Sequence, residues 1–361
     1  MVPRTTVICS GPPPSAYKST PNLHYMRGEP PIPPDWTHYI STSFNRLFLN
    51  PASGCEGKCR YCYIYDFGHG THSKLFETPL TDLVSWIENA VEIIKGRNGF
   101  LFSIGSSCDP FEEAVVHKTI DLIEAIAPFE NPIQVSTKFA LGEPLVDRLC
   151  SALRYKNQLV LFGTVTTFDH WKRFEPGTRP PDERLDTLQR FGTREVPTCI
   201  AIKPYLPSVA GNELQRFLKE IKIRNIGSVL VGSLYANQKL LKRLRSDPFS
   251  ANSFSEADCH IGTRPPPSKT HDIQAKMGDV NLGNAALEAI SFFSEQGVPA
   301  FHSAPCVSAY FSQTLCATGV WRYLPHLCVK CNVSCEKRFH DQHFGGGLIF
   351  PRKVEGLLAH E

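Results

Sequence analysis

The sequence predicts an α/β fold: an open, partial (β/α)6 barrel of TIM-like architecture, followed by a cysteine-rich C-terminal extension. Two observations carry this prediction. Six short apolar runs alternate with helix-like stretches between residues 44 and 235, and cysteines gather near the C-terminus. Such an alternation is typical of parallel strands that are buried on both faces and joined by right-handed helical crossovers. Because a closed barrel needs eight units, six units indicate a barrel that stays open.

The expected strands are runs of four to eight residues rich in Val, Ile, Leu or Phe. They are Arg46–Asn50, Gly99–Gly105, Pro132–Thr137, Gln158–Val165, Thr198–Ile202 and Ile226–Gly232. The expected helices between them are Thr81–Lys95, Glu113–Ile126, Pro144–Leu153, Pro181–Phe191 and Asn212–Ile221. The first helix is marked most clearly, because Thr81 is a suitable N-cap and apolar residues follow at helical spacing.

Three segments are expected along the chain. Residues 1–43 are rich in proline and predict an extended arm. Residues 44–235 predict the barrel, and residues 236–361 predict an extension with a candidate second metal site. Within the extension we expect a helix at about Asn284–Gln296, and an apolar run follows near Pro299–His302.

The composition narrows the class of protein. Hydrophobic residues make up 42% of the 361 residues and charged residues 20%, close to ordinary globular values. The chain has no apolar run of transmembrane length and no N-terminal apolar segment of signal-peptide length. We therefore expect a cytoplasmic protein without a membrane partner, whose 13 cysteines are mostly reduced and available to metals or catalysis. The net charge of +3 favours a small-molecule substrate over nucleic acid.

The most informative motif is C-x3-C-x2-C, formed by Cys55, Cys59 and Cys62 directly after the first expected strand. Three thiolates at this spacing can bind three corners of a [4Fe–4S] cube, which leaves the fourth iron open to a small molecule. The alternative is a zinc site completed by His69 or His72, because zinc prefers four ligands. In that case the chain belongs to another class, a zinc-knuckle protein that binds nucleic acid or a partner.

This motif resembles the defining motif of the radical S-adenosyl-L-methionine (radical SAM) superfamily, in which an aromatic residue such as Tyr61 also precedes the last cysteine. The resemblance implies a [4Fe–4S] cluster with SAM on its open iron. It implies reductive cleavage of SAM to methionine and a 5′-deoxyadenosyl radical, which abstracts hydrogen from a substrate that the sequence does not identify. A one-electron donor such as ferredoxin or flavodoxin is then required.

Later segments resemble the spore photoproduct lyase-like branch of this superfamily, in the expected order over residues 45–235. They are Ser106-Ser-Cys-Asp109-Pro110-Phe-Glu-Glu113, Ser136-Thr137-Lys138, Glu175-Pro176-Gly177 with Arg184-Leu185, and Lys203-Pro204-Tyr-Leu-Pro207. Nearly all follow expected strands, at the edge where parallel barrels build active sites. The resemblance implies SAM-binding roles for Tyr61, Ser106, Ser107, Asp109, Lys138 and Arg184.

Several of these residues have a simpler structural alternative. Asp109 is equally suited to capping a turn, and Lys138 to a solvated surface. Arg184 can instead form an ion pair with Glu175 at a helix start. Cys108 is a candidate hydrogen-atom donor, because S–H bonds are weak, but also a candidate buried structural thiol. Tyr63, beside the last cysteine of the motif, is a further candidate catalytic residue.

A second cysteine group lies in the extension. It comprises Cys328, Cys331 and Cys335, with Cys306 or Cys316 as a possible fourth ligand. Soft thiolates suit an auxiliary [4Fe–4S] cluster, or zinc with His326 or His340, or redox chemistry without a metal. The group also resembles the C-terminal motif of a radical SAM enzyme of organoarsenical antibiotic biosynthesis. That resemblance implies transfer of the 3-amino-3-carboxypropyl group of SAM as the alternative reaction.

Overall fold

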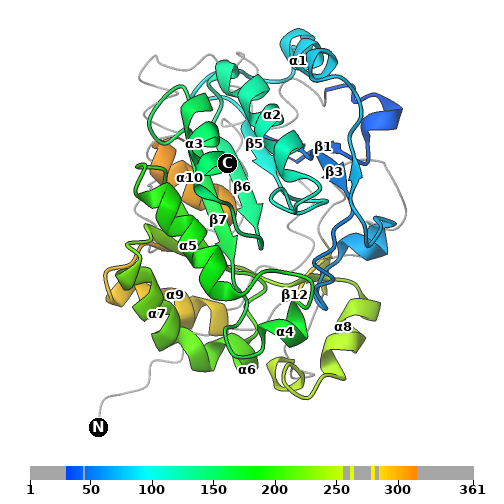
Figure 1. Ribbon diagram of the computed structural model, residues 1–361. Coiled ribbons are helices and arrows are strands. Elements are labelled where there is room, and N and C mark those ends of the chain that lie inside the picture. The colour runs from blue at the N-terminus through cyan, green and yellow to red at the C-terminus, as the bar shows by residue number, and fades with distance from the viewer. Residues whose placement is uncertain (1–29, 44, 255–260, 264–277, 281–283, 315–361) are drawn as a thin grey trace, which may run out of the picture.

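The computed structural model describes residues 30–43, 45–254, 261–263, 278–280 and 284–314. Its centre is an eight-stranded sheet of order β1-β2-β5-β6-β7-β8-β9-β13 (Figure 1). The strands are β1 (Ile40–Thr42), β2 (Arg46–Leu49), β5 (Leu101–Ile104), β6 (Ile133–Thr137), β7 (Leu159–Thr164), β8 (Thr198–Ile202), β9 (Ser228–Val231) and β13 (Ala300–Phe301). Within this sheet, only the β1–β2 pair is antiparallel.

All six expected strands form, in the expected sequential order. The seventh parallel strand, β13, falls in the apolar run of the extension and pairs with β9, with Ala300 opposite Val229. The opposite edge is β1, in which Ile40 lies opposite Leu49 of β2. The mixed α/β fold with a mostly parallel sheet is therefore confirmed, and its description as a partial barrel stays a prediction.

The helices connect the parallel strands. They are α1 (Leu80–Asn89), α2 (Val116–Ile126), α3 (Glu143–Ala152), α4 (Trp171–Phe174), α5 (Pro181–Gly192), α6 (Pro207–Ala210), α7 (Leu214–Ile223), α8 (Gln238–Arg245), α9 (Ala285–Glu295) and α10 (Ala304–Ser312). The first expected helix is shorter than predicted, because Ala90 is already extended. Pro79 is at its N-cap, so Thr81 lies inside the first turn. No helix in the described ranges is long and apolar enough to cross a membrane.

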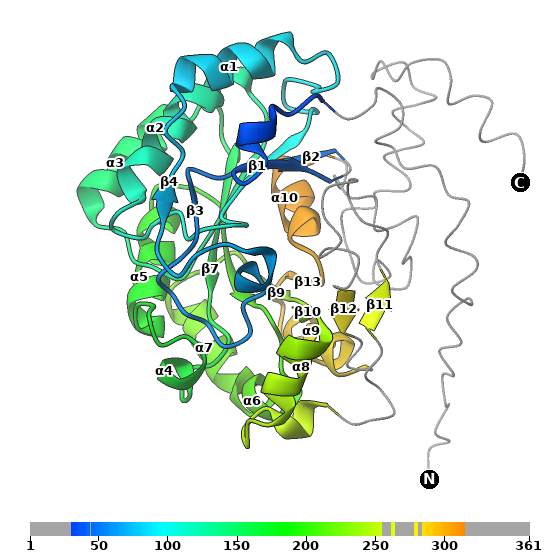
Figure 2. The ribbon, with the colours of Figure 1, turned by 90° about the vertical axis from the view of Figure 1, so that its right-hand side faces the viewer.

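Two hydrophobic clusters cover the two faces of the sheet, because successive strand residues point to opposite faces. On β7, Leu159 and Leu161 belong to the large cluster shared with α2, α3, α5, α7 and α9. Val160 and Phe162 belong to a smaller cluster shared with α10. Figure 2 shows α1, α2, α3 and α5 along one side of the sheet and α10 on the other. The helix α10 thus packs on the face of the sheet opposite the large cluster.

Two small sheets complete the described structure. β3 (Ala52–Ser53) pairs with β4 (Lys74–Leu75). The segment between them, which contains the three cysteines of the first motif, is therefore a loop whose two ends are held together. β10 (Tyr235–Ala236), β12 (Gly278–Val280) and β11 (Ile261–Thr263) form a three-stranded antiparallel sheet. In parallel sheets the loops after the strands lie on one edge, where the motif residues gather.

Candidate active site

The cluster loop, residues 54–63, follows β3 and carries the three cysteines. Its start is fixed by Gly54, whose N–H donates to Ser107 O at 2.9 Å. Gly54 has φ +94, and a Cβ there would come within 2.3 Å of His72 O, so only glycine fits. Further along, Arg60 N donates to Phe174 O at 2.8 Å. The loop is therefore tied both to the end of β5 and to the segment before α5.

The three thiols of the cluster loop differ in burial, and the backbone of Gly57 lies beside two of them. Cys59 is buried, and Cys55 and Cys62 are half-buried. A Cβ on Gly57 would lie 3.3 Å from Cys55 Sγ and 3.6 Å from Cys59 Sγ, so the backbone of Gly57 lies close to both sulfurs. Burial raises the pKa of all three thiols, so metal binding as thiolates must release protons.

This donor set fits a [4Fe–4S] cluster. In such a cluster each thiolate binds a different iron, so the sulfurs do not converge on one ion. Within the described part of the chain, no group of three or more Cys, His, Asp or Glu side chains is placed to hold a metal ion, so the three cysteines match the cluster by residue type and spacing. The histidines of the zinc alternative have other contacts: His69 Nδ1 lies 2.7 Å from Ser53 Oγ, and His72 Nδ1 lies 3.1 Å from Glu56 Oε1.

Asn50, which sequence reasoning missed, organises the loop after β5. Its buried side-chain oxygen accepts hydrogen bonds from the N–H groups of Gly105, Ser106 and Ser107 at 3.3, 2.9 and 3.2 Å. Its amide nitrogen donates to Ser106 Oγ at 2.9 Å. The Ser107 hydroxyl donates to Ala52 O at 3.2 Å. The two serines expected to bind SAM are thus held in place by the residue that directly follows β2.

Asp109 joins the ends of β5 and β6. Its carboxylate accepts from Thr137 Oγ1 at 2.6 Å, from Lys138 N at 2.7 Å and from Phe111 N at 3.0 Å. Burial raises the pKa of Asp109 despite these bonds. Because its oxygens are engaged within the protein, the geometry favours the capping interpretation of Asp109.

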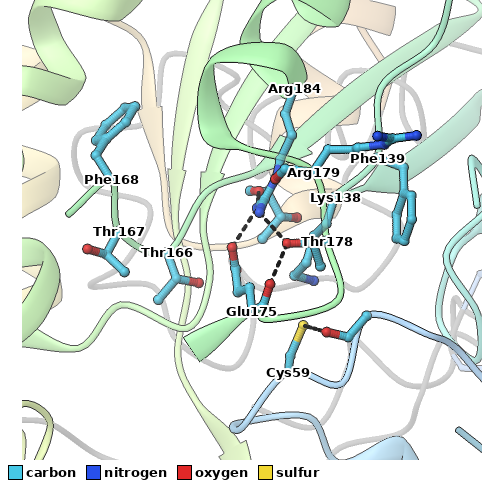
Figure 3. A network of polar contacts seen from close by, with 12 residues as sticks. Cys59, Lys138, Phe139, Thr166, Thr167, Phe168, Glu175, Thr178, Arg179 and Arg184 are labelled. Atoms are coloured by element: carbon cyan, nitrogen blue, oxygen red, sulfur yellow. Dashed lines mark hydrogen bonds and ion pairs between the residues drawn. The ribbon is translucent and has the colours of Figure 1, made fainter. Parts of the chain in front are cut away.

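Lys138 extends from the end of β6 toward Glu175 and Cys59 (Figure 3). Its Nζ lies 5.7 Å from the centroid of the Tyr61 ring. Burial lowers the pKa of Lys138, but Cys59, Glu175 and Asp109 together raise it above its ordinary value. The side chain is therefore a fixed cation beside the cysteines, suited to a carboxylate ligand.

A buried ion pair lies next to the cluster loop. Arg184 Nη1 lies 2.5 Å from Glu175 Oε2, and neither side chain is exposed. The guanidinium also donates to Thr164 O at 2.7 Å, to Arg179 O at 2.6 Å and to Thr178 Oγ1. Figure 3 shows this network. The geometry favours the ion-pair interpretation of Arg184, because its guanidinium has no surface left for a cofactor.

Tyr61 connects this ion pair to the cluster loop. Its hydroxyl donates to Glu175 Oε1 and accepts from Thr166 Oγ1 at 3.0 Å. Burial, followed by the charge of Glu175, raises the pKa of Tyr61. The Tyr61 hydroxyl is therefore a buried anchor, and any contact of Tyr61 with SAM involves other atoms.

Two candidate catalytic residues lie nearby. Cys108 is 6% exposed and packs with Ala52 and Val115, and burial raises its pKa, which favours a structural thiol. Tyr63 is half-buried, and its hydroxyl lies 3.4 Å from Ser106 O. Its ring packs edge-on against Tyr235 with 5.4 Å between the centroids, and burial raises its pKa to about 12.

The acidic end of the β5 motif differs from the expected match. Glu113 is exposed, whereas Glu112 is 2% exposed and its Oε2 accepts from Glu56 N at 3.0 Å. Glu112 is therefore the acidic residue that contacts the cluster loop. Because both residues are glutamates, the sequence does not reveal which of the two side chains is buried.

The second metal site falls almost entirely outside the described residues, which exclude Cys316, Cys328, Cys331 and Cys335. Cys306 is described. It lies on α10, is 8% exposed, and belongs to the smaller hydrophobic cluster that contains Val160 and Phe162. The auxiliary cluster therefore stays a prediction.

No protein-family profile matches the chain. Its fold is similar to those of radical SAM enzymes of known structure. A variant of spore photoproduct lyase with bound AdoMet and dinucleoside spore photoproduct has a TM-score of 0.53 and 16% identity, over 71% of this chain and 76% of that one. The radical SAM methyltransferase TsrM from Kitasatospora setae has a TM-score of 0.50 and 9% identity, over 83% of this chain and 62% of that one.

Among curated proteins the chain is similar to spore photoproduct lyase of Bacillus subtilis, with 26% identity over 154 residues. The match covers 42% of this chain and 44% of that protein. The similarity confirms the prediction that the chain resembles the spore photoproduct lyase-like branch. Because the match spans less than half of that relative, the activity of this chain is a proposal.

Proposed function

We propose that the chain holds a [4Fe–4S] cluster through Cys55, Cys59 and Cys62 and cleaves SAM reductively. One electron and one SAM would give methionine and a 5′-deoxyadenosyl radical, which takes a hydrogen atom from the substrate. The cluster supplies the electron and the coordination of SAM. The observation that carries the proposal is the placement of three thiols in one loop at the carboxyl edge of a parallel sheet, with the Lys138 cation beside Cys59.

The protein's own residues would bind and orient SAM. Lys138 offers a cation to the methionine carboxylate, and the Ser106 hydroxyl, fixed by Asn50, offers a contact to its amino group. The buried Glu175–Arg184 pair would hold the loop and its cysteines at a constant position. The partial barrel, with α10 packed on the face of the sheet opposite the large cluster, would shield a radical from water.

The substrate is proposed by class only. The structure of the related lyase variant contains a dinucleoside photoproduct, which is a property of that protein. For this chain we propose a small molecule, because a net charge of +3 gives little general attraction to nucleic acid. An auxiliary [4Fe–4S] cluster at the C-terminal cysteines belongs to the same proposal.

Metal analysis followed by product analysis tests the function. After anaerobic reconstitution, about four irons per chain indicate one [4Fe–4S] cluster and about eight indicate two. Dithionite and SAM are then added, and 5′-deoxyadenosine is the expected product. Methylthioadenosine with aminocarboxypropyl products would instead support the alternative transfer reaction. Zinc alone, with SAM intact, would contradict both reactions and support a zinc-binding protein.

A further inference from the structure

The helix α8 presents a basic face to solvent. Its sequence, QKLLKRLR, has four basic residues and no acidic residue. The three leucines are buried, whereas Lys239, Lys242 and Arg245 are exposed. The helix is therefore amphipathic, with positive charge along its outer side.

This helix packs directly behind the cluster loop. Its leucines belong to the same hydrophobic cluster as Cys59 and Tyr61. In addition, Arg243 Nε donates to Arg60 O at 2.8 Å. Because Arg60 follows Cys59 in the chain, the basic helix is among the surfaces closest to the cysteines.

Two arginines extend the positive surface beside α8. Arg173 Nε lies 2.8 Å from Asp247 Oδ2, and Arg60 Nη1 lies 3.5 Å from the same oxygen. Each arginine side chain is 37% exposed, whereas that of Asp247 is 0% exposed. One buried carboxylate therefore offsets two partly exposed cations, and the excess charge is positive.

The helix dipole accounts for three of the four charges of α8, because Lys242, Arg243 and Arg245 lie in the last turn, where cations are favourable. It does not account for the fourth charge. Lys239 lies in the first turn, where a cation opposes the helix dipole. It is also three residues from Lys242 and four from Arg243, spacings at which like charges repel. An anionic partner bound to this face would relieve that repulsion.

We infer that α8, with Arg60 and Arg173, is the docking surface for an acidic one-electron carrier protein of the flavodoxin class. This inference rests on the proposed function, because a cluster at Cys59 needs an electron from outside. A reduced flavodoxin would lose one electron and the cluster would gain it, with no atom transferred. Charge complementarity of this kind speeds weak redox encounters, which need only small interfaces. The position directly behind Cys59 favours a carrier over nucleic acid.

The test compares two double variants of the full chain. Lys239→Gln/Lys242→Gln removes two charges from α8. Lys219→Gln/Lys222→Gln, the control, makes the same change at exposed positions of α7, which lies at the lower left of Figure 1 whereas α8 lies at the lower right. Binding of oxidised flavodoxin is measured by calorimetry before reconstitution. At low salt the α8 variant should bind about tenfold more weakly, and the α7 variant should match the wild type. Equal affinity of the two variants would overturn the inference.

Reduction kinetics separate this inference from the proposed function. After reconstitution, reduced flavodoxin should reduce the α8 variant about tenfold more slowly than the wild type, and added salt should remove the difference. Dithionite should reduce both equally, since it needs no docking. If flavodoxin reduces the α8 variant at the wild-type rate, the docking surface is contradicted and the proposed function is not. The same holds if the α8 variant loses binding to duplex DNA and keeps its binding to flavodoxin. If the wild-type protein, given dithionite and SAM, does not cleave SAM, the proposed function itself is contradicted.

Discussion

Gly177 lies directly against the backbone of Glu56: a Cβ at position 177 would come within 2.0 Å of the Glu56 carbonyl oxygen. The Gly177 N–H also donates to Gly57 O at 3.0 Å. The segment before α5 and the cluster loop are therefore in close backbone contact. The short motif Glu175-Pro176-Gly177 serves this contact twice, because its glycine admits the loop and its glutamate binds Tyr61.

Gly177→Ala should displace the cluster loop. The new methyl group meets backbone rather than a movable side chain, so overpacking should lower the free energy of unfolding by about 1–3 kcal/mol. Iron retained after reconstitution should fall with it. Gly192→Ala is the matched control, because a Cβ at Gly192 meets no atom within 4 Å. Equal iron content in the two variants would show that the close approach does not position the cysteines.

Arg184→Met should be strongly destabilising. It leaves the buried carboxylate of Glu175 without its cation, which typically costs about 3–5 kcal/mol. Urea unfolding followed by circular dichroism measures the change. Arg148→Met, which removes an exposed ion pair with Asp121 and Glu124, should have a much smaller effect. Comparable losses in the two variants would argue against the buried network as the support of the cluster loop.

Lys138→Met should weaken SAM binding without loss of iron. Removing a cation that contacts a carboxylate costs about 1.5–3 kcal/mol, or roughly 10- to 100-fold in Kd. Equilibrium dialysis with SAM on the reconstituted protein gives the affinity, and iron content reports the cluster. Lys118→Met, on α2, is the control. If Lys138→Met binds SAM as tightly as the wild type, its assignment to the SAM carboxylate is wrong.

Cys108→Ala should leave SAM cleavage intact. The thiol packs against Ala52 and Val115, so its removal should cost about 1–2 kcal/mol of stability and no chemistry. The 5′-deoxyadenosine rate and the urea midpoint are compared with those of the wild type. A large loss of product turnover at unchanged stability would favour the hydrogen-donor interpretation instead.

The fold was predictable where apolar runs were long enough to stand out. β8 begins and ends as predicted, whereas β13 is two residues long and follows a long insertion, so its place beside β9 needed the structure. The end of α1 was overestimated, because the apolar periodicity continues to Ile94 after the helix has ended at Asn89.

The candidate site was predictable in its chemistry and less so in its supports. Cysteine spacing predicted Cys59 as a cluster ligand, and the order of the motifs predicted Lys138 as a SAM-binding residue. The structure then places the two close together. Asn50 and Glu112 were missed, because their partners lie more than 50 residues away in sequence. A buried polar side chain takes its role from such distant contacts, which residue type and spacing do not reveal.

The most direct test of the central claim is the yield of 5′-deoxyadenosine from the reconstituted wild type and from Cys59→Ala, each given dithionite and SAM without oxygen. Cys150→Ala, which alters a half-buried thiol on α3, is the control. We predict product from the wild type and the control, and none from Cys59→Ala, whose circular dichroism spectrum stays unchanged. Product from Cys59→Ala at the wild-type rate would contradict the assignment of the cluster to Cys55, Cys59 and Cys62.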